Sequence, residues 1–302
     1  MQIAAGTQVV AIINPVSGAG MDSNVAERRV NLVARELDRR NLRGDVRLTD
    51  RRGHARDLAA AAAAAQVPLV IIWGGDGTLN EAAGVLAGTQ SAIGLIPAGS
   101  GNGLAASLRV PRDPQAALER ALEAPARPID VGVIGGRHFV NIAGVGVDAR
   151  IATLFNQRAK GSRGRWPYIA IGLREGVTYR GRRYRVELDG GAAYRGRALL
   201  LAFANGREYG MGAKLAPGAE LDDGLLDAFV IEDRSVAARF WDCRHLALGS
   251  VERAPGILVR KVRQATIVSE DGPMEYHVDG EPGVFEDQID VRVMPAALKV
   301  KA

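Results

Sequence analysis

The chain has 302 residues, of which 47% are hydrophobic and 24% charged, a composition that suits a soluble globular protein and excludes a disordered or fibrous one. Its 39 lysines and arginines outnumber 34 aspartates and glutamates, which gives a formal net charge of +5. So small an excess suits an anionic cofactor or a membrane surface, and we expect no nucleic-acid partner.

The single cysteine, Cys243, allows no disulfide within the chain, which favours a reducing compartment. Residues 1–15 lack the basic segment and cleavage pattern of a signal peptide. The most apolar stretch, residues 58–73, contains Gln66 and Pro68 and does not resemble a membrane span. We therefore predict a cytoplasmic protein with peripheral membrane association.

Strand and helix patterns alternate over the first hundred residues. Short apolar runs predict strands at 9–13, 45–49, 69–73 and 92–97, and helical spacing of apolar residues predicts helices at 24–40, 53–65 and 79–88. This order predicts an α/β domain with a doubly wound parallel sheet. A short helix between prolines in residues 111–130 marks a boundary region. The rest of the chain reads as a mainly antiparallel sheet, with helical interruptions near 149–177 and 235–249.

Three glycine-rich turns follow predicted strands of the first domain, at residues 14–20, 74–78 and 97–103. Ligands of α/β sheets bind beyond the carboxyl ends of the strands, and glycine lets phosphate oxygens approach backbone N–H groups. Each turn also carries one hydroxyl side chain: Ser17, Thr78 and Ser100. None of the turns is a Walker A loop or a GxGxxG fingerprint. The three together predict a phosphate-binding edge.

Asp76 lies inside the second turn. A carboxylate beside bound phosphates is repulsive unless a divalent cation lies between them. The alternative is that Asp76 caps the helix that follows it. The two roles can coexist, and we predict that Asp76 helps to position a nucleotide and its metal.

Four segments in this order resemble the diacylglycerol kinase catalytic domain family, the bacterial lipid kinases that are similar to eukaryotic sphingosine and ceramide kinases. They are NPVSG at 14–18, GGDGTLNE at 74–81, PAGSGN at 97–102 and VDGE at 278–281. The resemblance covers residues 9–300. It implies a nucleotide-binding α/β domain like that of NAD kinases and phosphofructokinases, and an antiparallel β-sandwich-like domain that binds lipid.

The last strand returns to the first domain in this family. The resemblance therefore implies a nucleotide-binding domain of residues 1–129 with the returning segment 292–302, and a lipid-substrate domain of residues 130–291.

The same resemblance implies a set of ATP contacts. These are Asn14, Pro15, Val16, Ser17, Gly18, Thr49, Gly74, Gly75, Asp76, Gly77, Thr78, Leu79, Asn80 and Ser100. His54 departs from the acidic residue usual in the family at that position. The third turn reads GSGNG where the family more often has GTAND, which is closer to sphingosine and ceramide kinases and leaves the lipid open.

Residues 217–227 resemble the structural magnesium loop of the family. The implied ligands are the Asp223 carboxylate and the backbone carbonyls of Glu220 and Leu225. From the residues alone, the stretch equally suits a tight acidic turn. By the same resemblance, Asp130 and Asp148 lie near the active site, and both equally suit hairpin or cap positions.

The segment around Asp279 and Glu281 carries the predicted general base. A lipid hydroxyl must lose its proton as the phosphoryl group arrives, and a carboxylate that accepts this proton contributes about 10²–10⁴ in rate. The two residues lie on one side if the segment is extended. We favour Asp279 as the base and Glu281 as an alternative base or orienting residue. The alternative for Asp279-Gly280 is a plain hairpin turn, and for His277 we expect only a core or surface position.

We thus predict an ATP-dependent lipid kinase that uses Mg²⁺, with a diacylglycerol-type lipid as its acceptor. The alternatives are a sphingoid-base or ceramide kinase, an NAD kinase and a non-catalytic nucleotide- or lipid-binding regulator. The expected partner is lipid at a membrane surface, and a homodimer is left open.

Overall fold

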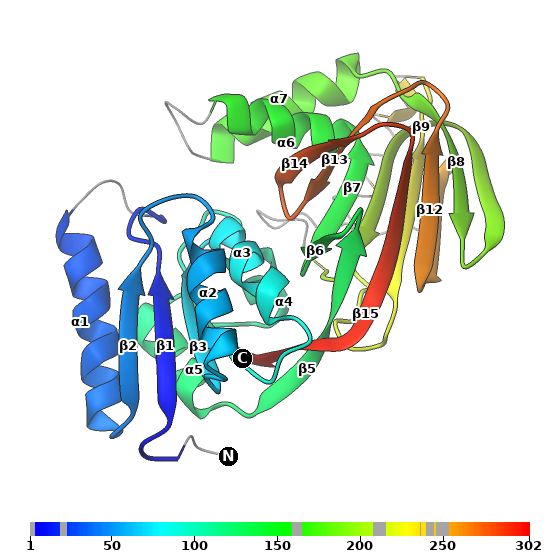
Figure 1. Cartoon of the computed structure of the whole chain (residues 1–302). Helices are drawn as coiled ribbons and strands as arrows, with labels where there is room; N and C mark the ends of the chain where they lie inside the picture. Colours follow the sequence, from blue (N-terminus) through cyan, green and yellow to red (C-terminus); the bar gives the residue numbers. More distant parts are fainter. Residues whose placement is uncertain are drawn as a thin grey trace. The chain divides into compact units, whose positions relative to one another are not determined.

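The computed structural model describes residues 4–18, 23–158, 165–207, 216–235, 237–239, 245 and 254–302 (Figure 1). Cys243 and most of the helix expected at 235–249 lie outside the described residues. The chain forms two compact units, Met1–Val131 with Ala296–Ala302, and Gly132–Pro295. The sequence places these boundaries at 129/130 and 291/292.

The first unit is built on a parallel sheet in the strand order β2-β1-β3-β4, and the end of β15 adds a fifth strand beside β4. The strands are β1 (Gln8–Ile13), β2 (Arg43–Leu48), β3 (Leu69–Gly74), β4 (Ala92–Pro97) and β15 (Gln288–Lys301). Every residue of β3 is buried, as expected of a central strand covered on both faces. The predicted parallel sheet is confirmed.

Helices cover both faces of this sheet (Figure 1). They are α1 (Ser23–Arg39), α2 (His54–Ala64), α3 (Asp76–Leu86), α4 (Gly103–Ser107) and α5 (Pro114–Glu123). The step from β1 to β2 runs opposite to the steps from β2 to β3 and from β3 to β4. Right-handed crossovers therefore place α1 on one face and α2 and α3 on the other. Arg40, just after α1, pairs with Glu123 of α5.

Helix α3 begins at Asp76, inside the glycine-rich turn and earlier than the predicted start at residue 79. Gly75, with φ −94° and ψ −173°, is the extended residue before its first turn. An aspartate at the first helical position is favourable because its charge faces the positive end of the helix dipole. The apolar periodicity does not reveal this start, because glycine and aspartate fill the first turn.

The second unit is an antiparallel sheet structure. Its strands are β5 (Ala126–Ile134), which begins in the first unit, β6 (Arg137–Phe139), β7 (Ile142–Gly146), β8 (Arg182–Leu188), β9 (Gly191–Ala204), β10 (Leu226–Glu232), β11 (Ile257–Val262), β12 (Gln264–Ser269), β13 (Met274–Val278), β14 (Glu281–Phe285) and the first part of β15. The order is β14-β13-β7-β9-β8-β12-β15, and β10 branches from β9 to carry β11.

Two apolar clusters fill this unit. The larger one contains Phe139, Tyr184 and Phe203 and takes side chains from most of its strands, as in a sandwich-like core. The smaller one contains Leu200 and Phe229. Helices α6 (Val147–Arg158) and α7 (Arg165–Thr178) fill the interruption predicted at 149–177, and α6 packs on β7, β13 and β14.

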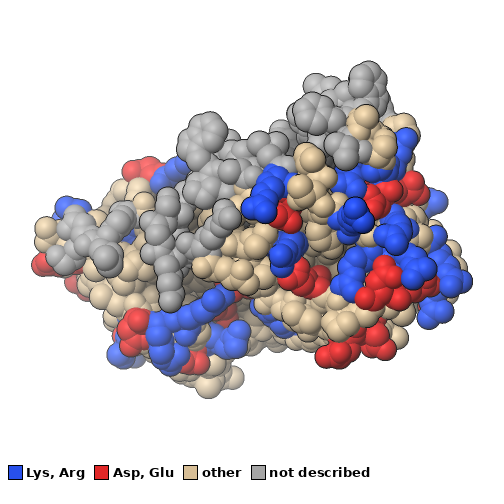
Figure 2. Space-filling view, turned by 90° about the horizontal axis from the view of Figure 1, so that it is seen from above, with Lys and Arg blue, Asp and Glu red and all other residues tan. Residues whose placement is uncertain are grey.

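Basic and acidic side chains alternate over the face of the molecule that Figure 2 presents. The second unit has surface ion pairs, among them Arg183–Asp271 and Arg195–Glu270. Within the described residues, no helix is long and apolar enough to cross a membrane.

Candidate functional site

The three glycine-rich turns of the first unit meet at the carboxyl end of its sheet. The N–H of Asn14 donates to the carbonyl of Trp73, and the N–H of Ala98 donates to that of Gly74. A Cβ on Gly18, whose φ is +75°, would lie 2.0 Å from the carbonyl oxygen of Ala98. Only glycine allows this approach, so the turns form one continuous backbone edge.

Asp76 binds the third turn to the second. Its Oδ2 accepts the N–H of Asn102 at 2.7 Å and its Oδ1 accepts the N–H of Gly103 at 2.8 Å. The Asn102 side chain in turn accepts the N–H of Gly99 at 2.8 Å. Two charge-assisted hydrogen bonds make this a strong connection. We call Asp76 with Asn102 and Gly103 the Asp76 clamp.

The alternative that Asp76 caps a helix is thus correct, but the helix is α4 and not α3, the helix that follows Asp76. The N-cap of α3 is Gly75, and no side chain caps it. The Asp76 carboxylate instead accepts the N–H groups of Asn102, the N-cap residue of α4, and of Gly103, its first residue. Sequence periodicity cannot reveal this pairing, because the partners lie 26 and 27 residues further along the chain.

The first two turns are joined by side chains. Asn14 donates from Nδ2 to the Thr78 hydroxyl at 2.9 Å, and Thr49 reaches the same edge through its N–H bond to Ile13. Glu81, which the sequence did not single out as a contact, accepts the N–H of Gly53 at 2.8 Å. The other predicted ATP contacts lie in or next to the same turns. The turn after β1 contains Pro15, Val16 and Ser17, and α3 contains Gly77, Thr78, Leu79 and Asn80. Ser100 is exposed in the third turn.

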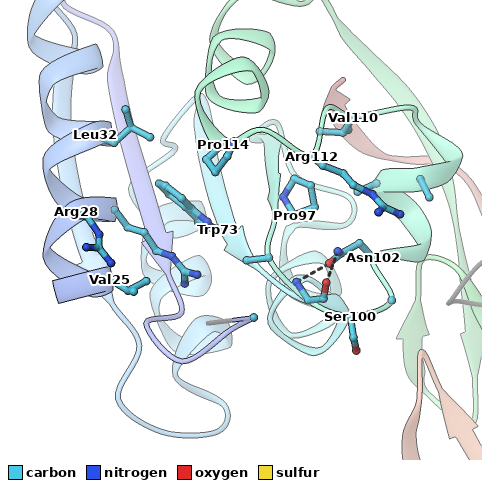
Figure 3. Close-up of a pocket in the computed structure, with 17 residues that line it drawn as sticks. Val25, Arg28, Leu32, Trp73, Pro97, Ser100, Asn102, Val110, Arg112 and Pro114 are labelled. Carbon is cyan, nitrogen blue, oxygen red and sulfur yellow. Dashed lines mark hydrogen bonds between the residues drawn. The ribbon is translucent and has the colours of Figure 1, made fainter. Parts of the chain in front are cut away.

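A cavity of about 600 Å³ opens beside the first and third turns. Figure 3 shows Arg28 and Leu32 of α1 on one side, Val110 and Arg112 on the other, and Trp73 between them. The arginines give the cavity a positive lining that favours anions.

Arg29 of α1 ties this lining to the first turn. Its guanidinium donates to the carbonyls of Asn14 at 2.6 Å and Ser17 at 2.7 Å, and lies 5.3 Å from the ring centroid of Trp73. Burial lowers the pKa of Arg29 from its ordinary value. Neither Arg28 nor Arg29 was singled out in the sequence, where helical spacing places them among the charges of an ordinary amphipathic helix.

In the second unit, Asp279 and Gly280 form the turn between β13 and β14. Their φ values are +46° and +86°, and Val278 pairs with Glu281 across the turn. This is a two-residue turn of the type that twisted hairpins favour. The segment is therefore a turn and not extended, which agrees with the hairpin alternative for Asp279-Gly280, and the condition under which Asp279 and Glu281 would lie on one side is not met.

The Asp279 carboxylate accepts three backbone N–H groups. Oδ1 accepts those of Asn141 at 3.0 Å and Ile142 at 2.9 Å, and Oδ2 accepts that of Val140 at 2.9 Å. We call this arrangement the Asp279 clamp. Glu281, the first residue of β14, is half-buried next to it. Asp279 thus secures the turn, and Glu281 follows it in the chain.

The remaining carboxylates have distinct partners. Asp130 is buried and accepts the N–H of Ala296 at 2.7 Å, which fixes the returning segment of the first unit. Asp148 lies 2.9 Å from His277.

In the predicted metal loop, the Asp223 carboxylate pairs with a lysine side chain of the same chain. Asp223 accepts the N–H of Leu225 at 3.0 Å through Oδ1 and forms an ion pair with the Lys261 ammonium through Oδ2. The hydrogen bond to Asp223 raises the pKa of Lys261, with further support from the charges of Asp227 and Glu220. Within the described ranges, no group of three or more metal-ligating side chains occurs. The Lys261 ammonium thus occupies one oxygen of the Asp223 carboxylate, and the predicted ligand set of Asp223 with the Glu220 and Leu225 carbonyls stays a prediction.

Comparison with family models matches residues 8–134 to the diacylglycerol kinase catalytic domain. Residues 141–302 match the YegS C-terminal NAD kinase beta sandwich-like domain. The two matches divide the chain close to the Val131/Gly132 boundary of the two units, and the second match also takes in the returning segment Ala296–Ala302.

Curated relatives match nearly the whole chain. A probable lipid kinase YegS-like protein of Chromohalobacter salexigens is 33% identical over 266 residues, 85% of this chain and 83% of the relative. A diacylglycerol kinase of Bacillus subtilis is 29% identical over 277 residues, 90% of this chain and 89% of the relative.

Solved structures share the fold. A diacylglycerol kinase from Bacillus anthracis superposes with a TM-score of 0.71 at 21% identity, over 97% of this chain and 96% of the other. An NAD kinase from Archaeoglobus fulgidus superposes with a TM-score of 0.53 at 14% identity, over 97% and 93%. The predicted relation to the NAD kinase fold is confirmed.

Proposed function

Since the chain belongs to the diacylglycerol kinase catalytic domain family, we propose that it transfers the γ-phosphoryl group of ATP to the hydroxyl of a diacylglycerol-type lipid. Membership itself makes it an ATP-using lipid kinase, a phosphotransferase with an alcohol acceptor. The observation that carries the proposal is the edge of three glycine-rich turns held together by the Asp76 clamp.

The glycine-rich edge would hold the phosphates of ATP. Backbone N–H groups of turn 74–78, at the start of α3, can donate to phosphate oxygens without a side chain in the way. In the first turn the N–H groups of Asn14, Val16 and Ser17 already donate to Trp73 and Asn14, so that turn would contribute its shape and its contact with Ala98. Mg²⁺ bound with ATP would neutralise charge on the transferred group. In this proposal Asp76 acts by shaping the edge. The predicted ATP contacts remain predictions.

We assign the proton acceptor to Glu281 in preference to Asp279. Three amides engage the Asp279 carboxylate, and a carboxylate so stabilised as an anion is a poor acceptor for a proton. Glu281 would take the hydroxyl proton as the lipid oxygen bonds to the γ-phosphorus. The bond from that phosphorus to the β–γ bridging oxygen breaks, and ADP leaves.

Contact with a membrane would be peripheral, because the acceptor resides in a bilayer. This part of the proposal is supported by the lipid kinase family alone.

The experiment is a phosphorylation panel with radiolabelled ATP and Mg²⁺. Diacylglycerol, ceramide, sphingosine, phosphatidylglycerol and an undecaprenyl-type alcohol are offered separately in mixed micelles, with NAD as a further acceptor. We expect label in diacylglycerol at the highest kcat/KM. Label in a sphingoid lipid would replace the acceptor class, and label in NAD or in no acceptor would refute the lipid kinase proposal.

A further inference from the structure

A buried hydrogen-bonded pair, His277 and Asp148, lies next to the Asp279–Gly280 turn. Nε2 of His277 is 2.9 Å from Oδ2 of Asp148, and the two residues are 2% and 4% exposed. Burying two ionisable groups is costly unless they satisfy each other. The proposed chemistry gives neither of them a role.

The backbone around this pair is shaped to admit it. Asp148 lies in the first turn of α6, and His277 pairs with Gly144 across β13 and β7. A Cβ on Gly144 would lie 2.0 Å from Oδ2 of Asp148. Glycine at position 144 therefore leaves the space through which the carboxylate reaches the imidazole.

The other ring nitrogen of His277 accepts a bond from the turn. The N–H of Gly280 lies 3.2 Å from Nδ1. A ring nitrogen that accepts a hydrogen bond carries no proton, so Nε2 carries it and donates to Asp148. Asp148 thus selects the tautomer of His277 whose Nδ1 can accept the Gly280 N–H. A carboxylate partner fixes the tautomer of metal-binding histidines in the same way.

A residue of helix α6 also binds the carbonyl group of Gly280. Nδ2 of Asn156 donates to the carbonyl oxygen of Gly280 at 3.1 Å. Gly280 is therefore held at its N–H by His277 and at its carbonyl by Asn156. The Asp279 clamp fixes the preceding residue, and the next residue is Glu281.

We propose that Asp148, His277 and Asn156 position the turn so that the Glu281 carboxylate meets the acceptor hydroxyl. They are positioning residues that act through the backbone of Gly280. The effect on kcat rests on the proposed function, whereas the positioning of the Gly280 backbone does not. The inference explains why ionisable groups are kept in the core, since a displacement of about 1 Å at a reacting group can cost 10²-fold in rate.

Two substitutions at position 277 separate the two contacts. The oxygen of His277→Asn lies near the place of Nδ1 and can accept the Gly280 N–H without reaching Asp148. The amide of His277→Gln lies near the place of Nε2 and can reach Asp148 without accepting from Gly280. We expect kcat to fall about 10- to 100-fold in His277→Gln and to stay within about 3-fold of wild type in His277→Asn. The KM for ATP should stay unchanged in both.

A second readout does not depend on turnover. Hydrogen exchange of the Gly280 amide, measured by NMR, should accelerate in His277→Gln and stay slow in His277→Asn. Equal exchange in wild type and both variants would overturn the inference, as would equal kcat values. If the exchange differs as expected but the wild-type protein phosphorylates no lipid, the positioning stands and the proposed function fails.

The partly exposed Asn156 provides a variant that leaves the core intact. Asn156→Ala should lower kcat about 3- to 10-fold with an unchanged melting temperature and KM for ATP. If Asn156→Ala and His277→Gln both kept the wild-type kcat, the proposal that these residues act through the backbone of Gly280 would be refuted.

Discussion

The two signature motifs, GGDG in the first unit and DGE in the second, both use their aspartate to accept N–H groups from a distant loop. Asp76 accepts two and Asp279 accepts three. The motifs differ in what the clamp supports. The Asp76 clamp joins two glycine-rich turns whose amides form an edge, whereas the Asp279 clamp secures a turn that precedes Glu281. In the proposed function, the Asp76 clamp shapes the edge that would bind ATP, and the Asp279 clamp supports the side chain assigned to proton transfer.

The substitution Glu281→Gln should have the largest effect. Gln retains the size of the side chain but cannot accept the hydroxyl proton, so kcat should fall about 10²–10⁴-fold. The melting temperature should stay unchanged. The matched control is Glu286→Gln, an exposed carboxylate just after the same hairpin, which should be fully active. Equal kcat in both variants would contradict the assignment of the base.

The substitution Asp279→Asn should reduce both stability and activity. An amide side chain presents its NH₂ to at least one of three backbone N–H groups, and the free energy of unfolding should fall by about 2–3 kcal/mol. Denaturant titration measures this change. If Asp279 were the base rather than the clamp, kcat would fall as far as in Glu281→Gln with no loss of stability.

The substitution Asp76→Asn should act on the nucleotide side. Because the carboxylate accepts two backbone N–H groups, the free energy of unfolding should fall by about 1–2 kcal/mol. The KM for ATP should rise, whereas the KM for lipid should stay unchanged. Asp113→Asn is the control, because Asp113 caps α5 in the same unit and asparagine caps helices about as well as aspartate. An unchanged KM for ATP in Asp76→Asn would separate the clamp from the binding edge.

The smallest effect concerns the acidic loop at Asp223. Because Lys261 supplies its positive charge, the melting temperature of the nucleotide-free wild type should be the same with Mg²⁺ and with a chelator. Lys261→Met removes the ammonium, and Mg²⁺ should then raise the melting temperature by about 2–4 °C. Lys299→Met, at a lysine of the first unit, should show no such response. A wild type that loses several degrees in the chelator would contradict the ion-pair account.

The first unit could be predicted from sequence because its signals are local. Strand β3 is a continuous apolar run, and the glycine-rich turns end apolar strands directly. The start of α3 at Asp76 escaped prediction because glycine and aspartate carry no periodic signal. The partners of Asp76 escaped for a different reason: they are backbone amides, which every residue has.

The arrangement around the second motif depends on contacts between distant parts of the chain. His277 and Asp148 lie 129 residues apart, and the amides held by Asp279 belong to the start of β7 and the residues before it. Spacing alone placed Asp279 and Glu281 on one side only on the condition that the segment is extended. The turn gives them separate environments, which only the backbone conformation reveals.

The most direct test of the lipid kinase account is a single-turnover experiment with the protein in excess over radiolabelled ATP and diacylglycerol present in micelles. The account predicts that phosphorylated lipid and ADP form in equal amounts, and that Glu281→Gln slows both together. ADP formed with inorganic phosphate and without phosphorylated lipid would contradict it.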